Sequence, residues 1–216
     1  MAYRKEIEEL GLKNAVSCVV GRHASAELDI KNREQVRGYI YYPDYDPGLS
    51  QKGKDSMPAV VAKMPGVHEW HSSPAERAMQ TTKYFCSDVH DLPVEEKAFG
   101  PSNPSGITDD VVDKWMETFN DDLLLDAYIT SGEFVADQAL ALQRLLELIK
   151  KADTSYAGKN IPFGIITHNE IGRLIKAWCD GLPIKEFVTD KCDIAKGSFV
   201  IITFHPNGNI VVKRSN

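Results

Sequence analysis

The stretch IPFGIITHNEIGRLIKAWCD, residues 161–180, predicts a strand followed at once by a helix. Its first part, IPFGIIT (161–167), is a short apolar run of the kind typical of a buried parallel strand. Two earlier segments repeat this order, because AVSCVV (15–20) predicts a strand, and a weaker strand around Val67–His71 precedes the helical SSPAERAMQTTKYF. Strands that alternate with helices predict the α/β class, here a three-layer sandwich with a largely parallel central sheet flanked by helices.

Local signals predict where the other helices begin. A helix is expected over 50–63, kinked or divided at Pro58. Ser73 and Glu76 have the spacing of a capping box, with Pro74 as the first helical residue.

A second capping box, Thr130 and Glu133, predicts the start of a long helix. The spacing of its apolar residues predicts one buried face, made of Val135, Ala139, Leu142, Leu146 and Ile149. SFVIITF (198–204) and NIVVK (209–213) predict a closing hairpin around Pro206-Asn207-Gly208.

Length and composition indicate one domain over residues 1–216, with an excursion from the core at about 87–133. Hydrophobic residues make up 43% and charged residues 26%, as in an ordinary globular protein. The net charge of −6 argues against a nucleic-acid partner. No apolar run approaches the roughly 20 residues that span a bilayer, so no membrane partner is expected. The N-terminal segment is polar and unlike a signal peptide, and the four scattered cysteines are therefore expected as free thiols in the cytoplasm.

Arginine and histidine residues follow three of the predicted strands. Arg22 and His23 come directly after the first, Arg77 lies in the first turn of the helix after the second, and His168 directly follows the third. Ligands of open α/β sheets bind beyond the carboxyl ends of the strands, so these side chains are expected to converge on one anion-sized site. Arginine offers a fork of donors that matches phosphate oxygens, and neutral histidine offers a nucleophilic nitrogen. The set predicts phosphoryl transfer through a phosphohistidine.

Four motifs extend this set, namely VVGRHAS (19–25), GLSQKG (48–53), SSPAERAMQT (72–81) and THNEIGR (167–173). In their order and spacing they resemble the histidine phosphatase superfamily, which includes the cofactor-dependent phosphoglycerate mutases. The resemblance covers residues 15 to about 204. It implies that His23 is the nucleophile, that Arg22 and Arg77 hold the phosphate oxygens, and that His168 donates to the transferred group.

Other roles follow from the resemblance where the match is weaker. Glu96, in LPVEEKAFG, is the expected proton donor, in preference to Glu95. Arg37 and Asn169 are candidate extra phosphate ligands, and Asn169 stands where the family has a glycine after its second histidine. The chain also departs from the family after the nucleophile, where Ala24 replaces a glycine.

The expected activity is that of a phosphomonoester hydrolase acting on a small phosphorylated metabolite. The alternatives are a phosphoglycerate mutase-type phosphotransferase and a non-catalytic binder of phosphorylated ligands. No cofactor and no metal are expected, because arginine and histidine would supply the positive charge that Mg²⁺ supplies elsewhere. His68 and His71 are spaced like some metal pairs, but they would point to opposite faces of a strand and no third ligand is near. A homodimer is left open. Candidates for the wall of a substrate pocket are Tyr39, Tyr41, Tyr42, Tyr45 and Trp115.

Overall fold

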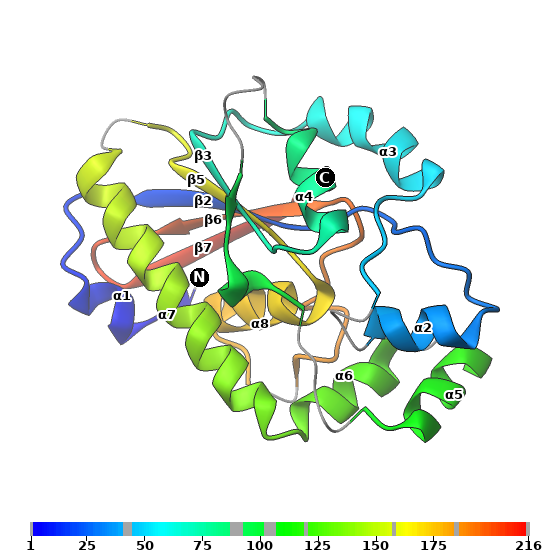
Figure 1. Cartoon of the computed structure of the whole chain (residues 1–216). Helices are drawn as coiled ribbons and strands as arrows, with labels where there is room; N and C mark the ends of the chain where they lie inside the picture. Colours follow the sequence, from blue (N-terminus) through cyan, green and yellow to red (C-terminus); the bar gives the residue numbers. More distant parts are fainter. Residues whose placement is uncertain are drawn as a thin grey trace.

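A seven-stranded mixed sheet forms the middle of the molecule in the part of the chain that the structure describes (Figure 1). The computed structural model describes residues 2–40, 45–86, 93–101, 107–118, 121–156, 159–183 and 186–214. Across the sheet the strands follow the order β1-β7-β6-β2-β5-β3-β4. In chain order they are β1 (Ala2–Tyr3), β2 (Val16–Arg22), β3 (Glu69–Ser72), β4 (Val94–Glu95), β5 (Phe163–Thr167), β6 (Phe199–Phe204) and β7 (Asn209–Arg214).

Helices cover both faces of this sheet, which confirms the predicted three-layer α/β sandwich. In chain order they are α1 (Lys5–Glu9), α2 (Arg33–Ile40), α3 (Gln51–Val61), α4 (Glu76–Lys83), the 3-10 turn η1 (Lys97–Phe99), α5 (Asp109–Thr118), α6 (Asp121–Ile129), α7 (Glu133–Ser155) and α8 (Asn169–Asp180). One face packs against α1, α7 and α8, and the other against α3 and α4 (Figure 1). The remaining three, α2, α5 and α6, gather at one end of the molecule, and we call them the cap helices.

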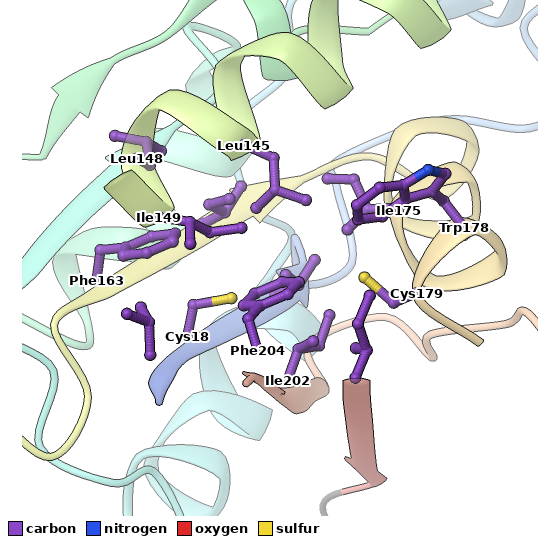
Figure 2. Packing of buried hydrophobic residues seen from close by; sticks show 14 of the residues in the cluster. Cys18, Leu145, Leu148, Ile149, Phe163, Ile175, Trp178, Cys179, Ile202 and Phe204 are labelled. Atoms are coloured by element: carbon purple, nitrogen blue, oxygen red, sulfur yellow. The ribbon is translucent and has the colours of Figure 1, made fainter. Parts of the chain in front are cut away.

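The side chains of β2 show why both faces need cover, because they alternate between the two sides of the sheet. Cys18 and Val20 point into the larger core, whereas Val19 points into the core beneath α3 and α4. Figure 2 shows the larger core, in which Leu145 of α7 and Phe163 of β5 lie among buried side chains from α8 and β6. A strand buried on both faces is apolar along its whole length, which is the pattern that predicted β2.

Parallel and antiparallel pairings occupy different parts of the sheet. β2, β5, β3 and β4 pair in parallel, whereas β6, β7 and β1 pair antiparallel. Arg22 at the end of β2 is paired with Thr167 at the end of β5, and Ser72 of β3 is paired with Ile166. The predicted largely parallel sheet is therefore confirmed for β2, β5 and β3. The carboxyl ends of these three strands meet at one edge of the sheet, where a ligand site is expected.

Both predicted capping boxes are wrong. Helix α4 begins at Glu76 with Ala75 as its N-cap and no side-chain cap. Helix α7 begins after Gly132, again without a side-chain cap. The Thr130 hydroxyl instead donates to the carbonyl of Asp126 at 3.0 Å, because Thr130 follows the last turn of α6 directly.

Other local predictions divide into confirmed and wrong ones. Ser50 caps α3, since its hydroxyl accepts the N–H of Gly53 at 3.1 Å. The predicted division at Pro58 does not occur, because α3 continues through it to Val61. The predicted hairpin of β6 and β7 is confirmed, with Gly208 at a φ of 79° in its turn.

The predicted buried face of α7 is confirmed in part, because Leu142 and Leu146 pack half-buried against the core, but its N-terminal part differs. Val135 is 68% exposed and Ala139 is also exposed, although Ile149 is buried as predicted. The buried residues of the helix are Phe134, Ala141, Leu145, Leu148, Ile149, Ala152 and Asp153. Apolar residues cover a broad part of the surface of α7. Packing on the sheet decides which of them are buried.

The cap helices have a small core of their own. It consists of Val36, Ile40, Ile107, Val112 and Trp115, with further apolar residues packed around them. This cluster includes part of the predicted excursion and lies beside the pocket described below. None of the described helices is long and apolar enough to cross a membrane.

Candidate active site

A pocket of about 420 Å³ opens at the edge of the sheet where β2, β5 and β3 end. Four of the predicted site residues line it together, namely Arg22, His23, Arg77 and His168. The backbone N–H of His23 donates to the carbonyl of Thr167 at 3.0 Å, so the strand ladder continues past the end of β2. This bond holds His23 and His168 beside each other, with ring centroids 5.0 Å apart.

The hydrogen bonds of His23 settle which ring nitrogen carries the proton. Its Nδ1 lies 2.7 Å from the carbonyl oxygen of Ala24. A carbonyl can only accept, so Nδ1 donates and Nε2 keeps its lone pair. Nε2 is thus the nitrogen able to attack an electrophile.

The surroundings of His23 keep its imidazole neutral. The ring is 2% exposed, and burial lowers its pKa well below the ordinary 6.5 because a buried charge loses its hydration. The positive charges of Arg77 and Arg22 lower the pKa further. A neutral imidazole between two guanidinium groups is suited to act as a nucleophile towards an anion.

His168 is held by partners on both sides of its ring. Its Nδ1 lies 3.3 Å from Nη2 of Arg77, which can only donate, so Nδ1 accepts. Its Nε2, 2.7 Å from the Ser73 hydroxyl, therefore carries the proton. Burial, followed by the charge of Arg77, lowers the pKa of His168 well below 6.5. The Ser73 hydroxyl also accepts the N–H of Ala75 at 3.2 Å, just before α4 begins at Glu76.

Arg77 is a buried cation with donor capacity left over. It is 2% exposed, and its guanidinium lies 4.6 Å from the ring centre of Tyr39. Nη1 lies 3.2 Å from a carboxylate oxygen of Asp46, and Nη2 contacts His168. Its Nε is buried without a hydrogen-bond partner among the described residues. An oxyanion in the pocket would satisfy this donor.

Two further cations flank the histidines. Nη1 of Arg22 lies 3.7 Å from Asp193, whose carboxylate also accepts from Arg173 at 3.0 Å. Lys196 lines the pocket, and its charge contributes to the lowered pKa of His23. The sequence analysis missed Lys196. Its signal was its place just before β6, because an antiparallel strand begins at the edge where its parallel neighbours end.

Glu96, the predicted proton donor, is not among the residues that line the pocket. Its Oε1 forms an ion pair with Nη2 of Arg144 on α7 and lies 3.1 Å from Nδ1 of His71. These partners turn the carboxylate toward the α7 face of the sheet. The structure therefore does not place Glu96 in the pocket with His23 and His168, and His71 does not line the pocket either.

Of the remaining predicted phosphate ligands, Asn169 lines the pocket and Arg37 does not. Arg37 is half exposed, pairs with Asp109 at 3.0 Å, and does not line the pocket. Asn169 does line it, and its side-chain oxygen accepts from Nε of Arg173 at 3.1 Å. Glu170 also lines the pocket and carries the single carboxylate among the described lining residues.

Apart from Ser25, which follows His23 and Ala24, apolar and aromatic side chains make up the rest of the described wall. They come from the loop after β2 and from the cap-helix region, and are Ala26, Leu28, Ile30, Tyr39, Ile40, Pro101, Ile107, Trp115, Leu124, Leu125 and Tyr128. Of the predicted pocket aromatics, Tyr39 and Trp115 are among them, whereas Tyr45 is not. Tyr41 and Tyr42 lie outside the described residues.

Most of the sequence matches a known family. The family model described as the histidine phosphatase superfamily (branch 1) matches residues 18–216. The chain belongs to this superfamily. No curated protein matches the chain significantly in sequence.

Solved structures of other proteins share the fold. Bacillus stearothermophilus YhfR superposes with a TM-score of 0.68 at 15% identity, covering 92% of this chain and 96% of that one. A mycobacterial glucosyl-3-phosphoglycerate phosphatase gives a TM-score of 0.67 at 14% identity, covering 94% and 99%. A phosphoglycerate mutase from Bacillus anthracis gives 0.60 at 14% identity, covering 95% and 94%. At such identities these likenesses concern the fold.

The superfamily motif GLSQKG supports the loop behind His23. The Ser50 hydroxyl and backbone N–H both donate to the carbonyl of Ser25, at 3.1 and 2.9 Å. A Cβ on Gly53 would lie 2.3 Å from that same carbonyl oxygen, so only glycine fits. Ala24, the departure from the family's glycine, is accommodated because its methyl group packs against Leu49 and a neighbouring methionine.

Proposed function

We propose that the chain hydrolyses phosphate monoesters through a phosphohistidine formed on Nε2 of His23. The observation that carries the proposal is the pair of neutral histidines, His23 and His168, held 5.0 Å apart in one pocket with two buried arginines. Membership of the histidine phosphatase superfamily supports the same chemistry.

The reaction would take two displacements at phosphorus. In the first, Nε2 of His23 forms a bond to phosphorus while the bond from phosphorus to the ester oxygen breaks and the alcohol leaves. In the second, water attacks phosphorus, the bond to Nε2 breaks, and inorganic phosphate is released. Arg22 and Arg77 would hold the equatorial oxygens, whose negative charge spreads in the transition state.

His168 would change its hydrogen bonding when the substrate arrives. The phosphate's negative charge favours the protonated imidazole and so raises its pKa. Protonation at Nδ1 converts the present acceptor of Arg77 into a donor toward a phosphate oxygen. Arg77 is then free to turn its own donors to the phosphate.

The leaving oxygen needs a proton, and we assign its donation to Glu170. Glu96 is occupied by Arg144 and His71 outside the pocket. Glu170 lines the pocket in the first turn of α8, two residues after His168. The same carboxylate would take the proton back from the attacking water in the second displacement.

Release of inorganic phosphate from a panel of phosphate monoesters tests this function. We expect turnover with the native chain and none with His23→Ala, while His205→Ala, in the distant β6–β7 turn, keeps full activity. Transfer to phosphoglycerate that requires a bisphosphorylated primer would identify a mutase instead. Phosphate binding without turnover would identify a non-catalytic binder.

A further inference from the structure

The pocket has two chemically different ends. The end at the strand edge holds Arg22, Arg77 and the two histidines. The other end is walled by aliphatic and aromatic side chains of the cap helices and of the loop before them. A volume of about 420 Å³ exceeds what a phosphate group alone fills and is in the range of pockets that hold larger ligands.

All the cations among the described lining residues lie at the first end. Arg22, Arg77 and Lys196 each lower the pKa of His23, which places their charges around that ring. The described part of the apolar wall contributes no lysine or arginine. A second anionic group on the substrate, such as a carboxylate, would therefore lose its hydration there without gaining a cation.

The apolar wall offers few polar side chains to a ligand. Its Tyr128 hydroxyl donates to Asp137 of α7 at 2.9 Å, and the face of the Tyr39 ring lies against the guanidinium of Arg77. A sugar brings several hydroxyl groups, each of which needs a partner when it is buried. An alkyl or aryl group needs none and gains from leaving water.

We propose that the site takes phosphate monoesters of apolar or aromatic alcohols that carry no second anionic group. This inference rests on the proposed function only for the position of the phosphate, at the two arginines. The alkyl or aryl group then lies along Ile30, Leu124 and Trp115.

Binding of alkylphosphonates tests the inference without any need for turnover, because their carbon–phosphorus bond replaces the ester bond. We expect the dissociation constant, measured by calorimetry from methyl- to hexylphosphonate, to fall roughly fourfold per methylene group. The heat-capacity change of binding should become more negative along the series. 2-Carboxyethylphosphonate should bind more weakly than propylphosphonate. A dissociation constant that does not change with chain length, or tighter binding of 2-carboxyethylphosphonate than of propylphosphonate, would overturn the inference.

Two variants test whether the apolar wall binds the alkyl chain. Ile30 is 43% exposed, so Ile30→Asn is compatible with folding, and Leu124→Gln replaces a half-buried side chain with one of similar length. In both variants the dissociation constant of the alkylphosphonates should depend less on chain length. The matched control is Leu140→Gln, an exposed leucine on α7 outside the pocket, which should keep the full slope. An unchanged slope in both pocket variants would count against the apolar wall as the binding surface.

Turnover of the corresponding alkyl phosphates separates the two proposals. Hydrolysis of many monoesters at rates that do not depend on chain length would support the proposed hydrolysis and contradict the preference for apolar substrates. Phosphonate affinity that rises steeply with chain length, without hydrolysis of any monoester, would support the apolar ligand class and contradict the proposed hydrolysis.

Discussion

The sequence analysis expects Glu96 to donate the proton, whereas our proposal assigns this role to Glu170, which lines the pocket. If Glu170 is the proton donor, Glu170→Gln should slow hydrolysis of an alkyl phosphate by about 10²–10⁴-fold. It should slow p-nitrophenyl phosphate much less, because nitrophenolate leaves without a proton. Rates of both substrates for each variant provide the measurement.

Glu96→Gln is the matched control, since it should lower stability through the lost ion pair with Arg144 and affect both substrates alike. The assignment fails if the dependence on leaving group occurs in Glu96→Gln and is absent in Glu170→Gln.

The charge state of His23 sets the acid side of the pH profile. Burial, Arg77 and Arg22 hold its pKa well below 6.5, so the ring stays neutral and nucleophilic at pH 6.5 and loses its lone pair only at lower pH. After correction for the ionisation of the substrate, kcat/KM should stay on its plateau through pH 6.5. Arg77→Gln removes one positive charge and should move the acid limb to higher pH. An acid limb of the native enzyme at or above 6.5 contradicts this account.

At the scale of elements, α7 provides a direct comparison of predicted and observed burial. Leu145 is fully buried, so Leu145→Ala should lower the free energy of unfolding by about 2–5 kcal/mol. Val135, predicted to be buried, is 68% exposed, so Val135→Ala should change it by no more than about 0.5 kcal/mol. Urea denaturation of both variants measures the difference. Equal losses of unfolding free energy in the two variants would show that Val135 is buried and would contradict the structure.

The sequence predicted elements well where the signal is local and less well where distant partners decide. Apolar runs located β2, β5 and β6 to within two residues. The capping box at Ser73 was wrong because α4 begins at Glu76 rather than at Pro74, and the Ser73 hydroxyl bonds to His168, a residue far away in the chain. The face of α7 was right at Leu142, Leu146 and Ile149 and wrong at Val135 and Ala139, because adjacent apolar stripes share the helical period and packing on the sheet decides which is buried.

At the scale of the whole molecule, the order of strands made much of the site predictable. His23 and His168 follow parallel strands that pair with each other, so their backbones had to meet at one edge. Glu96 and Arg37 were assigned by motif or proximity, yet their side chains pair with Arg144 and Asp109 on other helices. Side-chain direction at these positions depends on partners that no local pattern reveals.

The distribution of charge over the site also bears on metal dependence. The two buried arginines would supply positive charge of the kind that Mg²⁺ provides in other phosphoryl-transfer enzymes. No group of three histidine, cysteine or acidic residues among those described is arranged to hold a metal. We expect the rate of hydrolysis to be the same before and after treatment with EDTA. A loss of activity that one divalent metal restores would contradict this expectation.

Trapping the phosphoenzyme tests the central claim most directly. Rapid acid-free quenching of the native chain with a phosphorus-labelled monoester, followed by peptide mapping, should place one phosphoryl group on His23, stable to base and labile to acid. His168→Gln should retain the site of labelling, because His168 does not take the group, whereas His23→Ala should show none. Label on any other residue, or rapid turnover in which no phosphohistidine forms, would contradict the account.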